Sequence, residues 1–126
     1  MAVPDDWVER ARYDLETAKA MLAAGRYLYV LFCCQQAVEK AIKGIIALRS
    51  GEMPPRLHNL MRLAEKAELE VDEPTAERLR ALTAYYVQTR YPEEIRKLSA
   101  GVDRPLAEEA IRQTEELLQW LSTSMR

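Results

Sequence analysis

The sequence contains few of the residues on which metal sites and redox chemistry depend. It has one histidine, two cysteines and four glycines in 126 residues. A structural zinc site takes four ligands, usually cysteine and histidine, whereas Cys33 and Cys34 are neighbours that point about 100° apart on a helix. Adjacent cysteines also cannot form an ordinary disulfide with each other. The sequence therefore predicts no metal site, no cofactor and no disulfide, and it favours two small buried or half-buried thiols.

Long apolar runs and known catalytic motifs are absent as well. No stretch approaches the 18 or so apolar residues that a membrane span requires, and the first residues, MAVPDDW, carry acids where a signal peptide is hydrophobic. We therefore expect a cytoplasmic protein without a membrane partner. The sequence has no glycine-rich phosphate loop, no HExxH and no nucleophile elbow, so no such motif predicts an enzyme activity.

The charge of the chain is nearly balanced, with a formal net charge of −2. A strongly basic nucleic-acid-binding protein is therefore excluded. Basic residues nevertheless gather between positions 40 and 66, and acids dominate the later part of the chain. This asymmetry predicts either a local basic face or a solvated helix surface.

The strongest pattern in the sequence is the segment 27–50, bracketed by Gly25 and Gly51. Its apolar residues recur at helical spacing and cover a wide arc, so we expect a central helix buried on two sides; they are Leu28, Val30, Leu31, Cys34, Ala37, Val38, Ala41, Ile42, Ile45, Ile46 and Leu48. Ala47 is expected on the polar side, together with Gln36, Glu39, Lys40 and Lys43. Gln35 lies inside the apolar stripe, and its amide should have a fixed hydrogen-bond partner.

The rest of the chain is also predicted to be helical. A first helix capped by Asp5 or Asp6 ends at Gly25, a short one starts at Asn59, and the others span about 75–89 and 103–122, with 93–101 left open. Asp14 lies at the edge of the first helix's apolar stripe, where it is either a salt-bridge partner, the favoured interpretation, or a polar group in the next interface. The sequence shows no strand, so it predicts an all-α, up-and-down bundle of four long helices plus one short helix, forming a single domain over residues 1–126.

Two groups of polar residues at helix ends are candidates for chemistry. His58 precedes the short helix and either bonds to nearby backbone or serves as a general acid or base. Arg90 and Tyr91 end the 75–89 helix at Pro92. They either cap carbonyls and cover the end of the bundle or provide a phosphate-binding fork beside a stacking ring.

Several of these segments together resemble the HEPN domain family, across most of the chain. The first helix carries A-x-x-D-L-x-x-A (Ala11 to Ala18), and the central helix carries QQAVEKAIK (Gln35 to Lys43). His58, Asn59 and Leu60 lead into the short helix, and Tyr86, Arg90, Tyr91 and Pro92 form a Y-x-x-x-R-Y-P turn.

The resemblance implies a five-helix bundle that is commonly dimeric and, in prokaryotes, often encoded beside a minimal nucleotidyltransferase. Many family members resemble metal-independent ribonucleases in which an Arg is followed, after four to six residues, by a His, and the two protomers bring these residues together. In this sequence the corresponding positions after Arg90 hold Ile95, Arg96 and Lys97. The usual histidine is therefore missing.

Three functions follow from this resemblance. The first is a HEPN-like nucleotide- or RNA-binding or nucleotidyltransferase-partner module of a toxin–antitoxin-type pair, without the usual ribonuclease site; its candidate binding residues are Gln36, Glu39, Lys40, Lys43, Arg90 and Tyr91. The second is a metal-independent ribonuclease toxin that uses His58 and Arg90 in a composite dimer site. The third is a structural oligomerisation module. We expect a homodimer or higher oligomer, and weak RNA binding without useful cleavage.

Overall fold

The protein is all-α, as the sequence predicts. The computed structural model describes the backbone of residues 3–87 and 90–124, and the side chains of residues 6–87 and 90–124. This part of the chain forms helices and no strands. The helices are α1 (Val3–Ala23), α2 (Tyr27–Ser50), α3 (Leu60–Lys66), α4 (Glu73–Thr83), α5 (Pro92–Ala100) and α6 (Arg104–Thr123). None of them combines the length and apolar character needed to cross a membrane.

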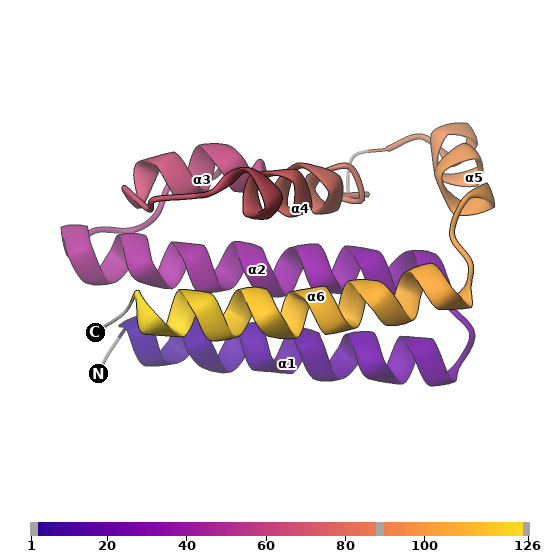
Figure 1. Cartoon of the computed structure of the whole chain (residues 1–126), viewed down its shortest axis with the longest axis horizontal. Helices are drawn as coiled ribbons and strands as arrows, with labels where there is room; N and C mark the ends of the chain where they lie inside the picture. The colour runs from indigo at the N-terminus through magenta and orange to yellow at the C-terminus, as the bar shows by residue number, and fades with distance from the viewer. Residues whose placement is uncertain (1–2, 88–89, 125–126) are drawn as a thin grey trace.

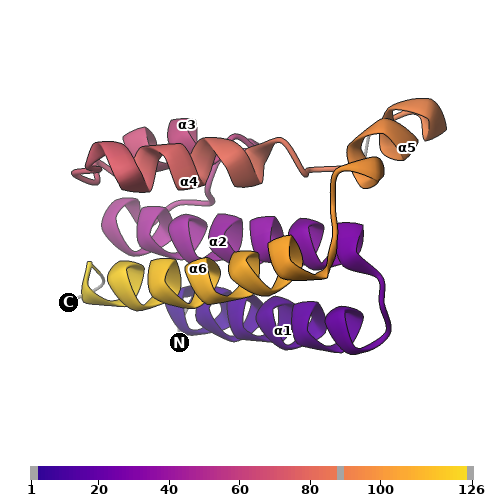
Figure 2. The ribbon, with the colours of Figure 1, turned by 45° about the vertical axis from the view of Figure 1, so that its right-hand side comes forward.

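Helix α2 lies in the middle of the molecule. Helices α1 and α6 run alongside it, and α3 and α4 pack on its other side (Figures 1 and 2). The apolar residues of α2 therefore meet neighbours in two directions, and Val38, Ile42 and Ile45 are fully buried. The prediction made from the wide apolar arc, that this helix is buried on two sides, is confirmed.

Glycine ends the first two helices, as expected. Gly25 has φ 74°, and around it Arg26 N donates to Met21 O at 2.8 Å while Gly25 N donates to Leu22 O at 3.1 Å. This pair of bonds is a Schellman motif, which requires the left-handed conformation that glycine adopts without strain. Gly51, with φ 73°, ends α2 in the same left-handed region. The short turn at Gly25 makes α1 and α2 antiparallel neighbours.

Side-chain caps start three of the later helices. Asn59 accepts from Arg62 N, Asp72 from Thr75 N and Asp103 from Leu106 N. The cap predicted at Asn59 and the helix start predicted near Asp103 are confirmed. Helix α1 instead begins at Val3, so Asp5 and Asp6 lie within it and the predicted cap there is wrong.

The segment after α4 differs from the expected helix over 75–89, of which residues 88–89 lie outside the described part. Helix α4 ends at Thr83, and the following amides of Tyr85 and Tyr86 bond to carbonyls three residues back. Tyr86 turns away to stack on His58. The open segment 93–101 forms most of α5, which stands apart from the bundle and has no fully buried residue (Figures 1 and 2).

Two predictions for the last turns of α2 are wrong. Ala47 is 6% exposed although it was expected on the polar side, whereas Leu48, expected in the apolar arc, is 45% exposed. The reason is that α3 packs on this end of α2, and the guanidinium of Arg49 donates to Ala67 O just after α3. The polar side of α2 is thus covered at this end.

Candidate functional site

A buried carboxylate, Glu39, organises the polar centre of the molecule. Its side chain is 5% exposed. Oε1 accepts from Gln35 Nε2 at 3.0 Å, Oε2 accepts from Lys43 Nζ at 3.0 Å, and His58 Nδ1 lies 3.1 and 3.2 Å from the two oxygens. Gln35, Glu39 and Lys43 come from successive turns of α2, so their side chains share one face. The carboxylate is therefore satisfied by donors on three sides.

His58 is held in one orientation by two residues of α2. Gln35 Nε2 donates to the backbone oxygen of His58 at 3.0 Å, and Glu39 accepts from its ring. Because a carboxylate can only accept, the proton of a neutral His58 ring is on Nδ1 and Nε2 is the basic nitrogen. The need of Gln35 for a fixed partner is thus confirmed, and the amide ties α2 to the start of α3.

Tyr86 covers the other side of the imidazole. Its hydroxyl lies 3.1 Å from His58 Nε2, and the two rings stack with centroids 4.1 Å apart and planes at 13°. Burial, with the negative charge of Glu39, raises the pKa of the Tyr86 phenol, so it stays protonated at neutral pH. A carboxylate, an imidazole and a phenol are thereby in contact in that order.

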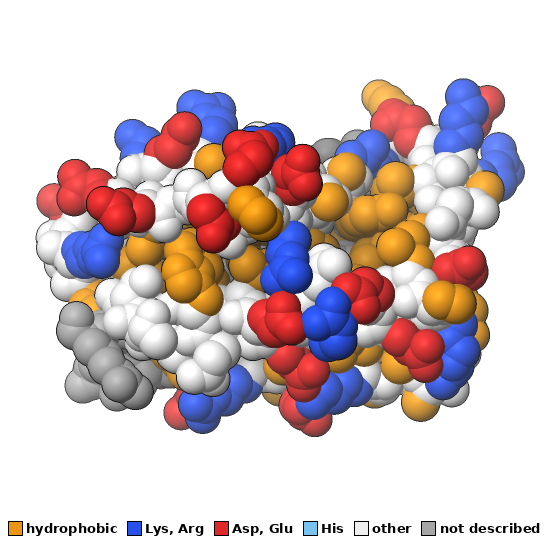
Figure 3. All heavy atoms as spheres, in the orientation of Figure 1, with side chains coloured by type: hydrophobic (Ala, Val, Ile, Leu, Met, Phe, Trp, Pro, Cys, Tyr) orange, Lys and Arg blue, Asp and Glu red, His pale blue; other side chains and the backbone are white. Residues whose placement is uncertain are grey.

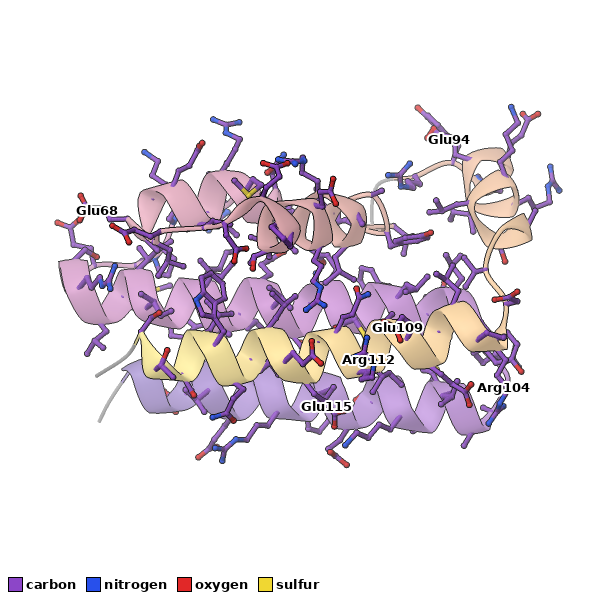
Figure 4. All side chains as sticks on the ribbon, in the orientation of Figure 1. Glu68, Glu94, Arg104, Glu109, Arg112 and Glu115 are labelled. Carbon is purple, nitrogen blue, oxygen red and sulfur yellow. The ribbon has the colours of Figure 1, made fainter. Side chains whose placement is uncertain are left out.

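An open depression of about 290 Å³ lies at the outer end of this chain of contacts. It is lined by His58, Asn59, Thr83, Tyr86, Arg90 and Glu94. These residues come from the start of α3, the end of α4 and the start of α5, which are far apart in sequence. Glu94 lies on α5 where that helix stands away from the bundle (Figure 4). The depression thus combines a cation, a carboxylate and a candidate base.

Arg90 is anchored at the end of α4. Nε donates to Tyr86 O at 3.0 Å and Nη2 donates to Ala84 O at 2.7 Å. This is the carbonyl-capping role predicted for it. A guanidinium has five N–H donors, so three remain without a hydrogen-bond partner among the described residues. Capping and anion binding are therefore compatible in this side chain.

The structure brings some of the predicted site residues together and places others elsewhere. His58 and Arg90 line the same depression, and Glu39 and Lys43 lie behind His58. Gln36 donates to Gln35 Oε1 at 2.7 Å and so supports the network indirectly.

Two of the predicted residues lie elsewhere. Lys40 pairs with Asp14 of α1 at 2.7 Å, which confirms the salt bridge expected for Asp14. Tyr91 is 75% exposed and does not line the depression.

Other residues of the depression were missed by the sequence reading. Tyr86 continues the apolar spacing of Leu79 and Leu82 in the predicted 75–89 helix, and this spacing indicates a core residue rather than a site residue. Its position one turn before Arg90 is the signal that places both at one helix end. Asn59 was recognised only as a cap, and Thr83 and Glu94 stand in no pattern that the sequence reveals.

The cysteines take no part in this site. Burial raises the pKa of Cys33 to about 11 and that of Cys34 to about 12. Such thiols are rarely ionised at neutral pH and are poor nucleophiles. Within the described part of the chain, no group of three or more histidine, cysteine or acidic side chains is placed to hold a metal ion.

The Glu39–Lys43 pair makes a stability prediction. Glu39→Leu should destabilise the domain by about 3–5 kcal/mol, because it leaves the Lys43 ammonium buried without its partner. The double variant Glu39→Leu, Lys43→Met should regain much of that loss, since no uncompensated charge remains. Urea unfolding of the three proteins measures both effects. Equal stability of the single and double variants would show that the pair is not coupled.

Comparison with known proteins gives a consistent result. The HEPN domain family matches residues 4–124. A Methanocaldococcus jannaschii protein named putative toxin MJ1304 is 27% identical, across 90% of this chain and 82% of its own. The crystal structure of TT1696 from Thermus thermophilus is 30% identical with a TM-score of 0.81, covering 98% of this chain and 99% of that one. ST0689, an archaeal HEPN homologue, is 25% identical with a TM-score of 0.70, and the match covers 100% of both chains.

Proposed function

The chain belongs to the HEPN domain family, and from this membership we propose that it is a toxin-like module that binds the phosphate of a nucleotide or of RNA in the depression between His58 and Arg90. The relative from M. jannaschii, named as a putative toxin, supports the toxin-like assignment. The observation that carries the binding site is the presence of Arg90 and His58 in one depression of a single chain.

The chemistry of the depression suits a phosphate. The guanidinium of Arg90 is a cation whose planar fork matches two phosphate oxygens. The side chain of His58 is 43% exposed, so a ligand can reach the ring. A volume of about 290 Å³ is at the small end for ligand pockets and fits a phosphate with its sugar rather than a whole nucleotide. Glu39 and Lys43 then act behind His58 and do not contact the ligand.

Glu94 opposes an anion in the same depression. Its carboxylate lines the same depression as Arg90 and carries the opposite charge. We therefore expect weak binding that depends on salt, since phosphate contacts release counterions. This acid also supplies an internal control, because its removal should change affinity in the opposite direction from removal of Arg90.

RNA binding tests the proposal. Arg90→Ala should weaken binding of a labelled single-stranded RNA by about 10–100-fold, which corresponds to the loss of about 1.5–3 kcal/mol from charge-assisted hydrogen bonds. Glu94→Gln should tighten binding, and Arg96→Ala, on the exposed surface of α5, should change it little. Fluorescence anisotropy at two salt concentrations measures all four proteins. If Arg90→Ala and Arg96→Ala weaken binding equally, the depression is not the binding site.

Metal-independent RNA cleavage is a second candidate function, favoured by the hydrogen bond between Glu39 and His58. General-base catalysis needs an oriented imidazole, and a carboxylate on Nδ1 provides that orientation. The family's usual histidine is absent after Arg90, but His58 reaches the same depression from another element. His58 and Arg90 line one depression within a single chain, so a site that uses both does not require a partner protomer.

Association with other chains stays a prediction. The half-buried Ile95 and Leu98 of α5 have few neighbours in the bundle, and Figure 3 shows hydrophobic side chains gathered between α5 and the rest of the molecule. An apolar surface of this kind supports a second copy of this chain or a nucleotidyltransferase as partner. Sedimentation analysis of the purified protein distinguishes a dimer from a 14.5 kDa monomer.

A further inference from the structure

A second hollow lies on the other side of α2 from the depression, between α1 and α6. Its volume is about 250 Å³. Residues between 8 and 15 of α1 and between 115 and 122 of α6 form its walls, and Ala41 of α2 forms its floor. We call this hollow the α1–α6 groove. It shares no lining residue with the depression that contains His58 and Arg90.

The groove exists because α1 and α6 each pack more closely on α2 than on each other. Where the three helices meet, α1 and α2 present the small side chains of Ala11 and Ala41, which are 3% and 6% exposed. Two methyl groups do not fill the space between three helices. Helices α1 and α6 run antiparallel (Figure 1), so their lining segments lie side by side over about 10 Å. The groove therefore suits an unbranched chain better than a bulky ring system.

Apolar side chains form most of the lining. Leu121 is almost fully buried, whereas Val8, Leu15 and Leu118 are half-buried and remain partly in contact with water. An apolar ligand that covers such a surface gains free energy in proportion to the area removed from water. Each methylene group of a bound chain should therefore strengthen binding by about four-fold until the groove is full.

The charge that remains available at the groove is positive. Arg12 is exposed at its edge, and its guanidinium forms no hydrogen bond or ion pair with any other described residue. Glu115, which lies where α6 faces α1 (Figure 4), is already paired, because its Oε2 is 3.2 Å from Lys19 Nζ. The amide of Gln119 on the opposite wall can donate further hydrogen bonds.

We propose that the α1–α6 groove binds an unbranched aliphatic carboxylate of medium chain length. The alkyl chain lies against Leu15, Leu118 and Leu121, and the carboxylate lies at Arg12. A neutral chain would leave Arg12 without a partner, and a chain with an ammonium head would be repelled by it. The groove extends over only two turns of each helix, so it is too short to hold a helix of another protein. This site is separate from the proposed phosphate site and does not depend on it.

A titration followed by NMR tests the proposal. The methyl signals of the full-length protein are recorded while octanoate, hexanoate, octan-1-ol or acetate is added below any micelle-forming concentration. We expect octanoate to shift the methyl signals of Val8, Leu15 and Leu118. Octanoate should bind about ten-fold more tightly than hexanoate, because it buries two further methylene groups. Acetate, which has the charge without the chain, should leave the signals unchanged.

A change at Arg12 separates the charge from the chain. Arg12→Gln should weaken octanoate binding by about five-fold, the upper range for an exposed ion pair, and leave octan-1-ol binding unchanged. Arg10→Gln is its matched control. Arg10 is an exposed arginine of the same helix, but its guanidinium lies over the Trp7 ring, 5.4 Å from the centroid, and does not line the groove. This variant should bind octanoate as the wild type does.

Each result decides the proposal. Equal binding of octanoate and hexanoate would show that the chain does not enter the groove. Equal loss of octanoate binding in Arg12→Gln and Arg10→Gln would show a general charge effect and no site. Methyl signals that ignore octanoate but shift when the protein is diluted would show that a second copy of this chain covers the groove, and the proposal would be wrong. RNA binding, measured separately, is unaffected by any of these results.

Discussion

Ile42→Asp should leave the domain unfolded at room temperature. Ile42 is 0% exposed and lies at the middle of α2, between the layer of α1 and α6 and that of α3 and α4. The substitution loses about 1.5–3 kcal/mol of apolar burial, and an unpaired buried carboxylate costs several kcal/mol more. Domains of this size are stable by about 5–15 kcal/mol. The loss therefore takes most or all of the stability.

Leu48→Asp is the matched control for this prediction. Leu48 lies on the same helix, but it is 45% exposed. Exposed substitutions usually change stability by less than about 0.5 kcal/mol, so this variant should melt close to the wild type. Circular dichroism melts of the two variants provide the comparison. Similar midpoints would mean that the buried side of α2 has been assigned wrongly.

The burial of α2 was predictable because it follows from the spacing of the apolar residues within that helix. A 24-residue helix with apolar residues on a wide arc can be satisfied only by neighbours on two sides. The exceptions at Ala47 and Leu48 depend on where α3 packs. That position is fixed by the proline-containing loop between α2 and α3, and helical periodicity carries no information about it.

The end of α4 also depends on a contact between distant parts of the chain, which helical periodicity does not predict. The sequence predicts a helix that continues toward Pro92, because no residue before it breaks the helical pattern. In the structure Tyr86 leaves the helix to stack on His58, which is 28 residues earlier in the chain. A contact at that separation competes with local helix propensity and cannot be read from a window of neighbouring residues.

The candidate site was predictable in part. Gln35 stands out as an amide in an apolar stripe, so the sequence predicts a fixed hydrogen-bond partner for it. In the structure its partners, Glu39 and the backbone oxygen of His58, belong to the network that holds His58. Glu39 and Lys43 form a pair with the i, i+4 spacing typical of exposed helix surfaces, yet both are buried. Their burial becomes visible only when the loop carrying His58 is placed over them.

His58→Ala should lower metal-independent RNA cleavage by about 10²–10⁴-fold, the usual contribution of general acid–base catalysis. His58 is the chain's one imidazole, and the structure places Nε2 beside the depression that contains Arg90. RNA affinity should fall only slightly, because the charged fork of Arg90 remains. Arg90→Ala should lose both affinity and cleavage, since it removes the cation that stabilises the phosphate.

The measurement uses labelled RNA in EDTA with four proteins: wild type, His58→Ala, Arg90→Ala and Arg96→Ala. Arg96 lies on the exposed surface of α5 outside the depression, so its replacement should leave cleavage unchanged. An RNA with a 2′-deoxy sugar at the cleavage position should bind and stay intact, because it lacks the attacking hydroxyl. Cleavage that persists in His58→Ala would show a contaminating nuclease or another base. Binding without cleavage by the wild type would agree with the expectation from the sequence, and the protein would then act through binding alone.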